Sequence, residues 1–438
     1  MNSLGNLVVL ALVYLAYIFI SFWLFNGNFL SPSFVFSVSM SLTLWLAYYA
    51  AVSMGMLFAI KIETALIFGF AGFVFLATEF FVYAMNTVKV LDRGEPVLNI
   101  KRQTLVIDPQ FQWAFTALLA VSFVLALLVL YLNTGGGSFS QRIAVYKRLV
   151  IHDQTKLRGY FIVSQLYKIG LAGADLCAYV LLYNLTVCGA KIREVLSYII
   201  DMVLYALLAS VFTGARVSAI ELILFMMMIY ITLNMTPGGR KKIYACIRKM
   251  LPVMVLIACL FTAAGALVGR DVGDRSRTQY LAEYVSGGLY AFNTHLDEGA
   301  STKRFGEASF AHVYSILQKA GLMAQEGTMV YGQFDIYGNT VTIFGRWYRD
   351  FGAIGVFIMA SLVSLCYSSV FYGRIIHSGN ITKEHHMSRI FYCQFIMSLV
   401  WAGFDDRIAT LMTVQTAVFL IFVTAFYKLL IVYKLKIF

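Results

Sequence analysis

Long runs of apolar residues, divided by short polar stretches, recur along most of this 438-residue chain. A helix needs about 20 predominantly apolar residues to cross a hydrocarbon core about 30 Å thick. Hydrophobic residues make up 60% of the chain and charged residues 13%, against about half and about a quarter in soluble domains. We therefore expect an all-α integral membrane protein, whose crossing helices satisfy their own backbone hydrogen bonds. The runs cover residues 5–26, 31–53, 63–86, 112–133, 160–186, 195–213, 218–236, 250–269, 353–373, 388–404 and 408–433.

These runs predict about eleven transmembrane helices, within a range of ten to twelve, in a single polytopic membrane domain over residues 1–438. Their orientation follows from Lys and Arg in short loops, which stay on the cytoplasmic side. With eleven helices, four basic clusters fall on the same side, so we place the N-terminus outside and the C-terminus inside. The clusters are Lys89, Arg93, Lys101 and Arg102; Arg240, Lys241, Lys242, Arg248 and Lys249; Arg374, Lys383 and Arg389; and Lys428, Lys434 and Lys436.

A basic loop over 134–159 is left on the outer, periplasmic side by this orientation. It carries five basic residues and a single acid, Asp153, against the usual tendency of translocated loops. A loop that departs from that tendency is a candidate for binding an anion. Its basic residues are Arg142, Lys147, Arg148, Lys156 and Arg158.

A second outer loop, over 270–351, is far longer than an ordinary connection and is balanced in charge. Phe310, Val313, Tyr314 and Leu317 recur in it at helical spacing, which predicts an amphipathic helix on the bilayer or against the bundle. The opposite, polar face of this helix carries His312, Ser315 and Lys319.

The motifs of several common chemistries are missing from the sequence. The six cysteines form no CxxC pair, and there is no P-loop, no GxSxG elbow and no HExxH pair. We therefore expect no metal and no cofactor. The net charge of +12 is divided between cytoplasmic loops and outer loops, as in a membrane protein, so no nucleic-acid partner is expected.

Ionisable residues inside apolar runs are costly and are functional candidates by default. Here they lie singly on different runs, so contacts between helices and a functional role both remain open. They are Glu79, Lys168, Asp175, Asp201 and Glu221. Arg216 lies in the tight outer turn between the sixth and seventh runs, where its planar guanidinium suits a phosphate or pyrophosphate. The alternative is an arginine that reaches lipid headgroups.

The end of the large loop is rich in polar and aromatic residues up to the start of the next apolar run. Arg346, Arg349 and Asp350 must lie at the level of the membrane interface. Trp347 and Tyr348 are suited to stacking on sugar rings, although an aromatic belt at the interface also explains them.

Three motifs, in order, make the chain resemble the bacterial Wzy-type polymerases of O-antigen and capsule repeat units. They are Ser31-Pro32 at the start of the second run, Thr213-Gly214-Ala215-Arg216, and Asn339-Thr340 followed by Asp350-Phe351-Gly352 and Gly355. Together with the two outer loops they span most of the chain. The family also has an Arg and a Gly separated by ten residues in outer loops, matched here by Arg148 with Gly159 and by Arg277 with Gly288.

The resemblance implies a GT-C-like polytopic glycosyltransferase of the bacterial inner membrane, with its active face in the periplasm and amphipathic helices in its large loop. Such enzymes join undecaprenyl-pyrophosphate-linked oligosaccharides into O-antigen or capsular polysaccharide without metal or nucleotide sugar. Membrane lipids and a chain-length regulator protein are the further partners implied. O-antigen ligases have a similar layout but carry a His beside the Asn, where this chain has Gly338, so a ligase mechanism is not carried over.

Such a reaction needs cations for the donor pyrophosphate and a base for the acceptor hydroxyl. We expect the cations to be Arg216 with Arg142, Arg148 and Arg277 or Arg304, and the base to be Asp350, Glu307 or His312. Arg346, Arg349 and Asn339 are further substrate-binding candidates.

Two other functions remain open. A flippase for lipid-linked oligosaccharides would also be polytopic and basic, but it should gather its cations inside the bundle and show internal repeats. A membrane acyltransferase should place a His with acidic or Arg partners at a helix end. Neither pattern is evident in the sequence.

Overall fold

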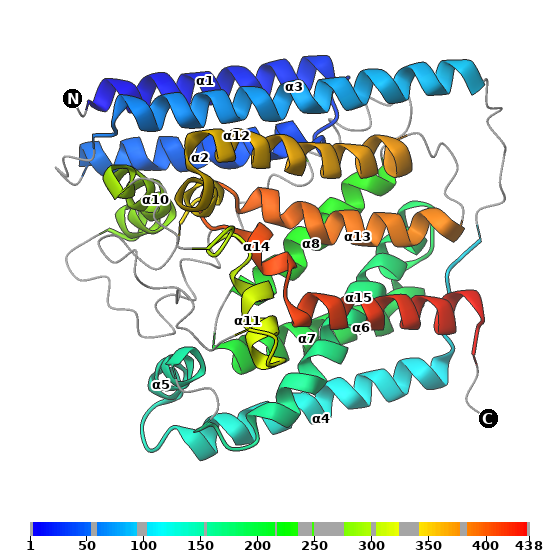
Figure 1. Cartoon of the computed structure of the whole chain (residues 1–438). Helices are drawn as coiled ribbons and strands as arrows, with labels where there is room; N and C mark the ends of the chain where they lie inside the picture. The colour runs from blue at the N-terminus through cyan, green and yellow to red at the C-terminus, as the bar shows by residue number, and fades with distance from the viewer. Residues whose placement is uncertain are drawn as a thin grey trace. The chain divides into compact units, whose positions relative to one another are not determined.

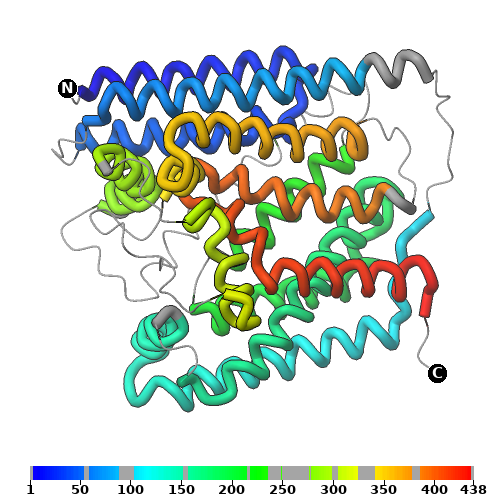
Figure 2. Tube along the Cα trace, viewed as in Figure 1, coloured from blue at the N-terminus to red at the C-terminus, as the bar shows by residue number. Residues whose placement is uncertain are grey.

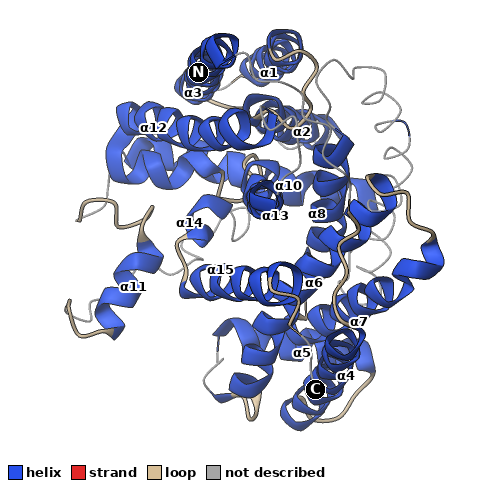
Figure 3. Ribbon diagram, turned by 90° about the vertical axis from the view of Figure 1, so that its right-hand side faces the viewer, coloured by secondary structure: helices blue, strands red, loops and turns tan. Residues whose placement is uncertain are grey.

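The computed structural model describes residues 3–53, 59–93, 103–152, 156–214, 217–234, 248, 276–298, 304–323, 341–376 and 383–435. These ranges contain helices joined by loops and no strand (Figure 3); their extended pairing is limited to one bridge, between Ser3 and Ile60. Eight of the described helices are long and apolar enough to cross a membrane. The predicted all-α, multi-pass membrane architecture is therefore confirmed. The count of eleven stays a prediction, and its run over 250–269 lies outside the described residues.

The helices overlap the predicted runs, although the helix Ile343–Val370 begins ten residues before the run 353–373 and the run 408–433 is divided between two helices. The eight candidate spans are α1 (Leu4–Leu24), α2 (Pro32–Ser53), α3 (Ile62–Arg93, of which Ile62–Thr87 is apolar), α4 (Pro109–Asn133), α6 (Tyr160–Thr186), η2 with α7 (Ile192–Val195 and Leu196–Thr213), α12 with η4 (Ile343–Val370 and Phe371–Ile376), and α15 with η5 (Val414–Phe426 and Tyr427–Val432). The others are α5 (Phe139–His152), α8 (Val217–Asn234), α10 (Arg277–His295), η3 (Leu296–Glu298), α11 (Ala311–Lys319), α13 (Lys383–Val400) and α14 (Arg407–Leu411).

The chain divides into two compact units that alternate along the sequence. The first unit comprises Met1–Val97, Val272–Gly379 and Gln394–Thr416. The second comprises Leu98–Asp271, Asn380–Cys393 and Ala417–Phe438. Each unit is described by itself below.

In the first unit, α1, α2 and α3 run lengthwise beside the longer part of α12, whereas α10 and the first turns of α12 are seen end-on (Figure 1). The tube trace shows α12 changing direction (Figure 2). The break is at Gly352, whose backbone angles, φ 67° and ψ −166°, belong to a region that is essentially confined to glycine. Residues 343–351 thus form a separate short helix that crosses the bundle before the spanning part of α12 begins.

A buried carboxylate, Glu79 of α3, joins three helical segments of the first unit, at the end of that unit where α2 begins. Its Oε2 accepts the backbone N–H of Ser33 at 2.5 Å, in the first turn of α2, and its Oε1 accepts the Tyr372 hydroxyl at 2.7 Å. A helix start favours an anion because its first N–H groups have no partner within the helix. The sequence left two roles open for Glu79, a contact between helices and a part in function, and these contacts favour the first.

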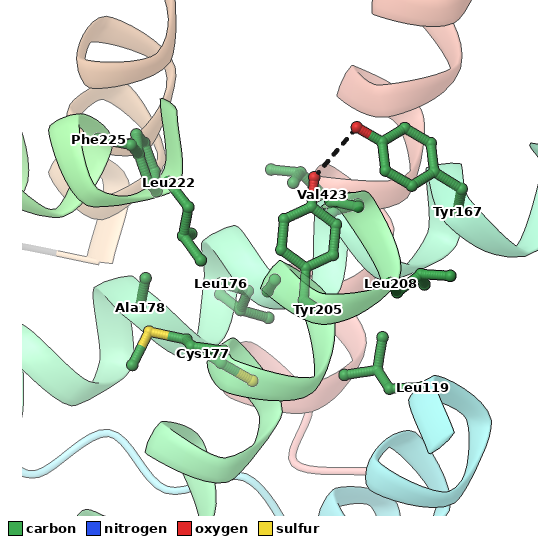
Figure 4. Packing of buried hydrophobic residues seen from close by; sticks show 14 of the residues in the cluster. Leu119, Tyr167, Leu176, Cys177, Ala178, Tyr205, Leu208, Leu222, Phe225 and Val423 are labelled. Atoms are coloured by element: carbon green, nitrogen blue, oxygen red, sulfur yellow. Dashed lines mark hydrogen bonds between the residues drawn. The ribbon is translucent and has the colours of Figure 1, made fainter. Parts of the chain in front are cut away.

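In the second unit the core forms around α6, the most deeply buried of the candidate spans. Side chains of α4, α6, α7, α8 and α15 interdigitate there (Figure 4), and the hydroxyl of Tyr205 donates to that of Tyr167 at 3.3 Å. Asp201 of α7 accepts hydrogen bonds from Gln112 and, at 2.6 Å, from Thr116, both on α4. This intramembrane acid therefore also joins helices.

Candidate functional site

The turn between α13 and α14, residues 401–406, lies against α2 and α10 at very close range. The Ser39 hydroxyl of α2 donates to the Val400 carbonyl at 2.8 Å and accepts the Gly403 N–H at 3.1 Å. A Cβ on Gly403 would come within 2.9 Å of the Ser39 carbonyl and 2.5 Å of the Thr43 hydroxyl, so only glycine fits without displacement.

The start of α12 joins the same turn. The N–H of Ile343 donates to the Ala402 carbonyl at 3.1 Å. Gly288 of α10 completes the contact, since a Cβ there would lie 2.9 Å from both the Phe404 carbonyl oxygen and the Thr342 nitrogen. The start of α12, α10 and the turn 401–406 are thereby held together by backbone contacts. The charged residues of α12 and of this turn are positioned by these contacts.

Arg346 lies at the centre of this assembly and is only 6% exposed. Its Nε is 3.2 Å from Oδ2 of Asp406, and its Nη1 donates to the Ala308 carbonyl at 2.8 Å. Phe344, two residues earlier in the chain, packs against Phe68 of α3, six residues after the start of that helix.

Two adjacent aspartates face the arginines and differ in how their oxygens are used. Asp406 caps α14, because its Oδ1 accepts the Ala409 N–H at 3.3 Å while its Oδ2 pairs with Arg346. Burial raises the pKa of Asp406 to about 6, although Arg346 opposes the rise. Oδ2 of Asp405 pairs with Nε of Arg407 at 2.8 Å. Burial raises the pKa of Asp405 as well, against the opposing charges of Arg407 and Arg346.

Asp350 anchors the turn that precedes α11. Its two carboxylate oxygens accept the N–H groups of Ala308 and Ser309, at 2.9 Å and 2.6 Å. Arg346 binds the carbonyl of the same Ala308, so the turn is held from both sides. Asp350 was predicted as a base, but both of its oxygens are engaged by backbone groups here, which favours an anchoring role.

The predicted amphipathic helix is confirmed as α11, and it carries His312 into the same neighbourhood. The ring is half-buried, and its Nε2 has no hydrogen-bond partner among the described residues. Burial and the nearby Arg346 charge both lower the pKa of His312, so its neutral form is favoured at neutral pH. Arg304 and Glu307 lie half-buried in the turn before α11, and Arg349 lies half-buried in the short helix before Gly352.

Five buried polar atoms on the segment 309–312, at the start of α12 and on the turn 401–406 lack a hydrogen-bond partner within the described part of the chain. Each such atom costs about 1–3 kcal/mol, and folded proteins contain few of them. Such atoms need a partner that the described residues do not supply, either ordered water or a polar ligand, so these segments form a candidate binding site. The atoms are Oγ of Ser309, Nε2 of His312, Oγ1 of Thr342, Nε1 of Trp401 and Oδ1 of Asp405.

The basic loop of the second unit forms the helix α5. The guanidinium of Arg142 lies 4.6 Å from the centre of the Tyr131 ring, and its Nε donates to the Gly137 carbonyl at 3.2 Å. Arg148 is exposed. The helix packs on the turn at Gly214, where a Cβ would meet the Lys147 Cβ at 3.0 Å. Of the remaining predicted cations, Arg216 lies outside the described residues, as does Asn339, and Arg277 begins α10 with its side chain outside them.

The structure thus brings together Arg346, Asp350 and His312 of the predicted site residues. It adds Trp401, Asp405, Asp406 and Arg407, which the sequence reasoning missed. A signal for them exists, because Asp405, Asp406 and Arg407 are three consecutive charges between the apolar runs 388–404 and 408–433. Arg216 was predicted from the same kind of position, a charge between two apolar runs on the predicted outer side.

Among the described residues, no three His, Cys, Asp or Glu side chains lie close enough together to hold a metal ion. Comparisons of the chain with protein-family profiles, with curated proteins and with solved structures found no significant match.

Proposed function

We propose that this protein is a membrane glycosyltransferase that polymerises lipid-linked oligosaccharide repeat units. Its substrates would be oligosaccharides carried on undecaprenyl pyrophosphate, joined on the periplasmic face of the bacterial inner membrane into O-antigen or capsular polysaccharide. The resemblance to Wzy-type polymerases suggested this activity, and the contacts around Arg346 give it a chemical basis.

The single observation that carries the proposal is the group of unpartnered buried polar atoms around the Arg346–Asp406 pair. Arg346 lies in the segment that carries the third motif of the resemblance, between Asn339 and Gly352. The atoms include donors, such as Nε1 of Trp401, and acceptors, such as Oδ1 of Asp405. A sugar with several hydroxyl groups offers both kinds of partner at once, which an aliphatic lipid does not.

The cations at the site suit the leaving group of this reaction. As the glycosidic bond to the donor breaks, negative charge develops on the pyrophosphate, and fixed guanidinium groups stabilise that charge. Arg346 and Arg407 are both held by carboxylates, so neither has to be reorganised when the charge appears. Because the side chains are positioned beforehand, the stabilisation acts in the transition state.

Aromatic side chains support sugar binding at the same place. Trp401 lies beside Arg407, whose guanidinium carbon is 5.8 Å from the ring centre, and next to Phe404. Aromatic rings stack on the apolar faces of sugars while polar neighbours bind the hydroxyl groups. The basic helix α5 of the second unit, with Arg142 and Arg148, is a further candidate for the pyrophosphate of a lipid-linked unit.

The test is deletion of the gene in its host, followed by electrophoresis of the surface glycolipid. The proposal predicts lipid A capped with one repeat unit and no longer chains, because single units still arrive but are not joined. Loss of every repeat unit would instead indicate a flippase. A full-length ladder in the deletion strain would contradict both functions.

A further inference from the structure

The acidic groups of the site differ in how much of their hydrogen-bonding capacity is already used. Both oxygens of Asp350 accept backbone N–H groups, and both oxygens of Asp406 are taken, one by the cap of α14 and one by Arg346. A carboxylate oxygen can accept more than one hydrogen bond, but each N–H donor or guanidinium that it already contacts stabilises its charged form. These contacts make Asp350 and Asp406 less suited to take a hydroxyl proton than they would be without them.

Asp405 is arranged differently. Its Oδ2 is fixed by Arg407 at 2.8 Å, whereas its Oδ1 is buried with no partner in good hydrogen-bonding geometry among the described residues. The residue as a whole is 8% exposed. One oxygen thus sets the orientation of the carboxylate, and the other has no hydrogen-bond partner among the described residues.

We propose that Oδ1 of Asp405 takes the proton from the attacking sugar hydroxyl, an inference that rests on the polymerase activity proposed above. The hydroxyl oxygen forms a bond to C1 of the donor's reducing-end sugar. The bond between C1 and the pyrophosphate oxygen breaks, and the leaving undecaprenyl pyrophosphate keeps the electron pair. The hydroxyl proton passes to Oδ1, so each linkage yields one longer chain and one undecaprenyl pyrophosphate.

The surroundings of Asp405 support this role. Burial makes its carboxylate a stronger base than an exposed aspartate, while Arg407 and Arg346 keep the charged form accessible. The backbone that carries it is fixed by Gly403 on α2 and by Phe404 on Gly288 of α10. A base held in this way needs little reorganisation to meet a bound hydroxyl.

His312 is the main competitor within the same site. Its Nε2 is also unpartnered, but burial and Arg346 both lower its pKa, so its ring is a weaker base than an ordinary imidazole. A neutral imidazole next to Arg346 is better suited to hydrogen bonding with a substrate hydroxyl. The orientation of Asp405 is fixed by Arg407 and by the backbone contacts of its turn, so we assign the proton to Asp405 and hydrogen bonding with the substrate to His312.

The test uses the full-length protein in proteoliposomes, supplied with undecaprenyl-pyrophosphate-linked single repeat units isolated from the deletion strain. Release of undecaprenyl pyrophosphate measures the rate. Asp405→Asn should lower kcat by about 100- to 10,000-fold with KM within about threefold of wild type, because a general base contributes about that factor. Glu79→Gln, a buried acid at the far end of the same unit, is the matched control and should leave kcat within about twofold.

The outcomes separate this inference from the proposed function. If the wild-type protein releases no undecaprenyl pyrophosphate, the polymerase proposal fails and the assignment of Asp405 fails with it. If the wild type is active and Asp405→Asn keeps kcat within about threefold, the function stands and the assignment is overturned.

A second variant decides the question if Asp405→Asn does not fold. Arg407 holds down the pKa of Asp405, so Arg407→Gln should move the acidic limb of the kcat–pH profile to higher pH. A purely structural role for Asp405 would lower kcat without moving that limb. An unmoved limb in Arg407→Gln therefore overturns the assignment.

Discussion

Replacing Arg346 by Met tests whether its pair with Asp406 organises the site. The two side chains are 7% and 1% exposed and approach to 3.2 Å, so removal of one leaves the other charged and buried. Breaking such a pair costs about 3–5 kcal/mol, and the lost hydrogen bond to the Ala308 carbonyl is included in the measured effect. Arg346→Met should therefore lower the free energy of unfolding by at least about 3 kcal/mol.

The companion variant is Asp406→Asn, which keeps a side-chain oxygen to cap α14. The double variant removes both buried charges, and replacement of a whole buried ion pair by neutral groups is often nearly neutral. We expect the double variant to lose only about 1.5–3 kcal/mol, the amount for the charged hydrogen bond to Ala308, and so to be more stable than Arg346→Met alone.

The assay is reversible unfolding of the purified protein in mixed detergent micelles, followed by tryptophan fluorescence. A coupling energy of at least about 2 kcal/mol between the two positions is the predicted result. If the stability losses of the two single variants add up to the loss of the double variant within about 0.5 kcal/mol, Arg346 and Asp406 are not coupled and the prediction is wrong.

Three further predictions concern acid, packing and the far end of the first unit. The pKa of Asp406 is about 6 in the folded chain against 3.8 for a free aspartate, so the folded state binds more protons between about pH 4 and pH 6. The unfolding free energy of wild type minus that of Asp406→Asn should therefore rise by on the order of 3 kcal/mol as the pH falls from 7 to 4, and a flat difference would contradict this. Gly403→Ala forces a methyl group against Thr43, which should lower the free energy of unfolding by about 1–3 kcal/mol and reduce polymer formation. Thr43→Ala in the same chain should restore part of the lost stability. Melting curves and glycolipid gels of the single and double variants measure both effects. Glu79→Ala leaves the Ser33 N–H and the Tyr372 hydroxyl without their partner and should cost about 1–3 kcal/mol for each, measured by the same unfolding assay, with Glu79→Gln losing less.

The membrane architecture could be predicted from sequence because the hydrophobic signal of a crossing helix is local. Runs such as 63–86 and 160–186 contain within themselves everything that determines their helices, and α3 and α6 follow them closely. The amphipathic α11 was predictable for the same reason, from the spacing of four side chains. The kink at Gly352 was not, because the position of one glycine does not say where a helix will change direction.

The site could be predicted only in part, because its geometry depends on contacts distant in sequence. The sequence identifies Arg346 by its polar surroundings, but its partner Asp406 is 60 residues further along and lies at the start of α14. Backbone groups determine which acid has an oxygen without a hydrogen bond. Asp350 is a predicted base, but its two carboxylate oxygens accept the N–H groups of Ala308 and Ser309. Spacing carries no information about such pairings, so Asp405 emerged only from the structure.

The proposed polymerase activity is tested most directly by the reconstituted reaction with the wild-type protein, in proteoliposomes that contain undecaprenyl-pyrophosphate-linked repeat units and no nucleotide sugar. A polymerase should produce a ladder of lipid-linked multimers and release one undecaprenyl pyrophosphate for each linkage formed. Lipid-linked units that stay single, whether or not they cross the membrane, would contradict it.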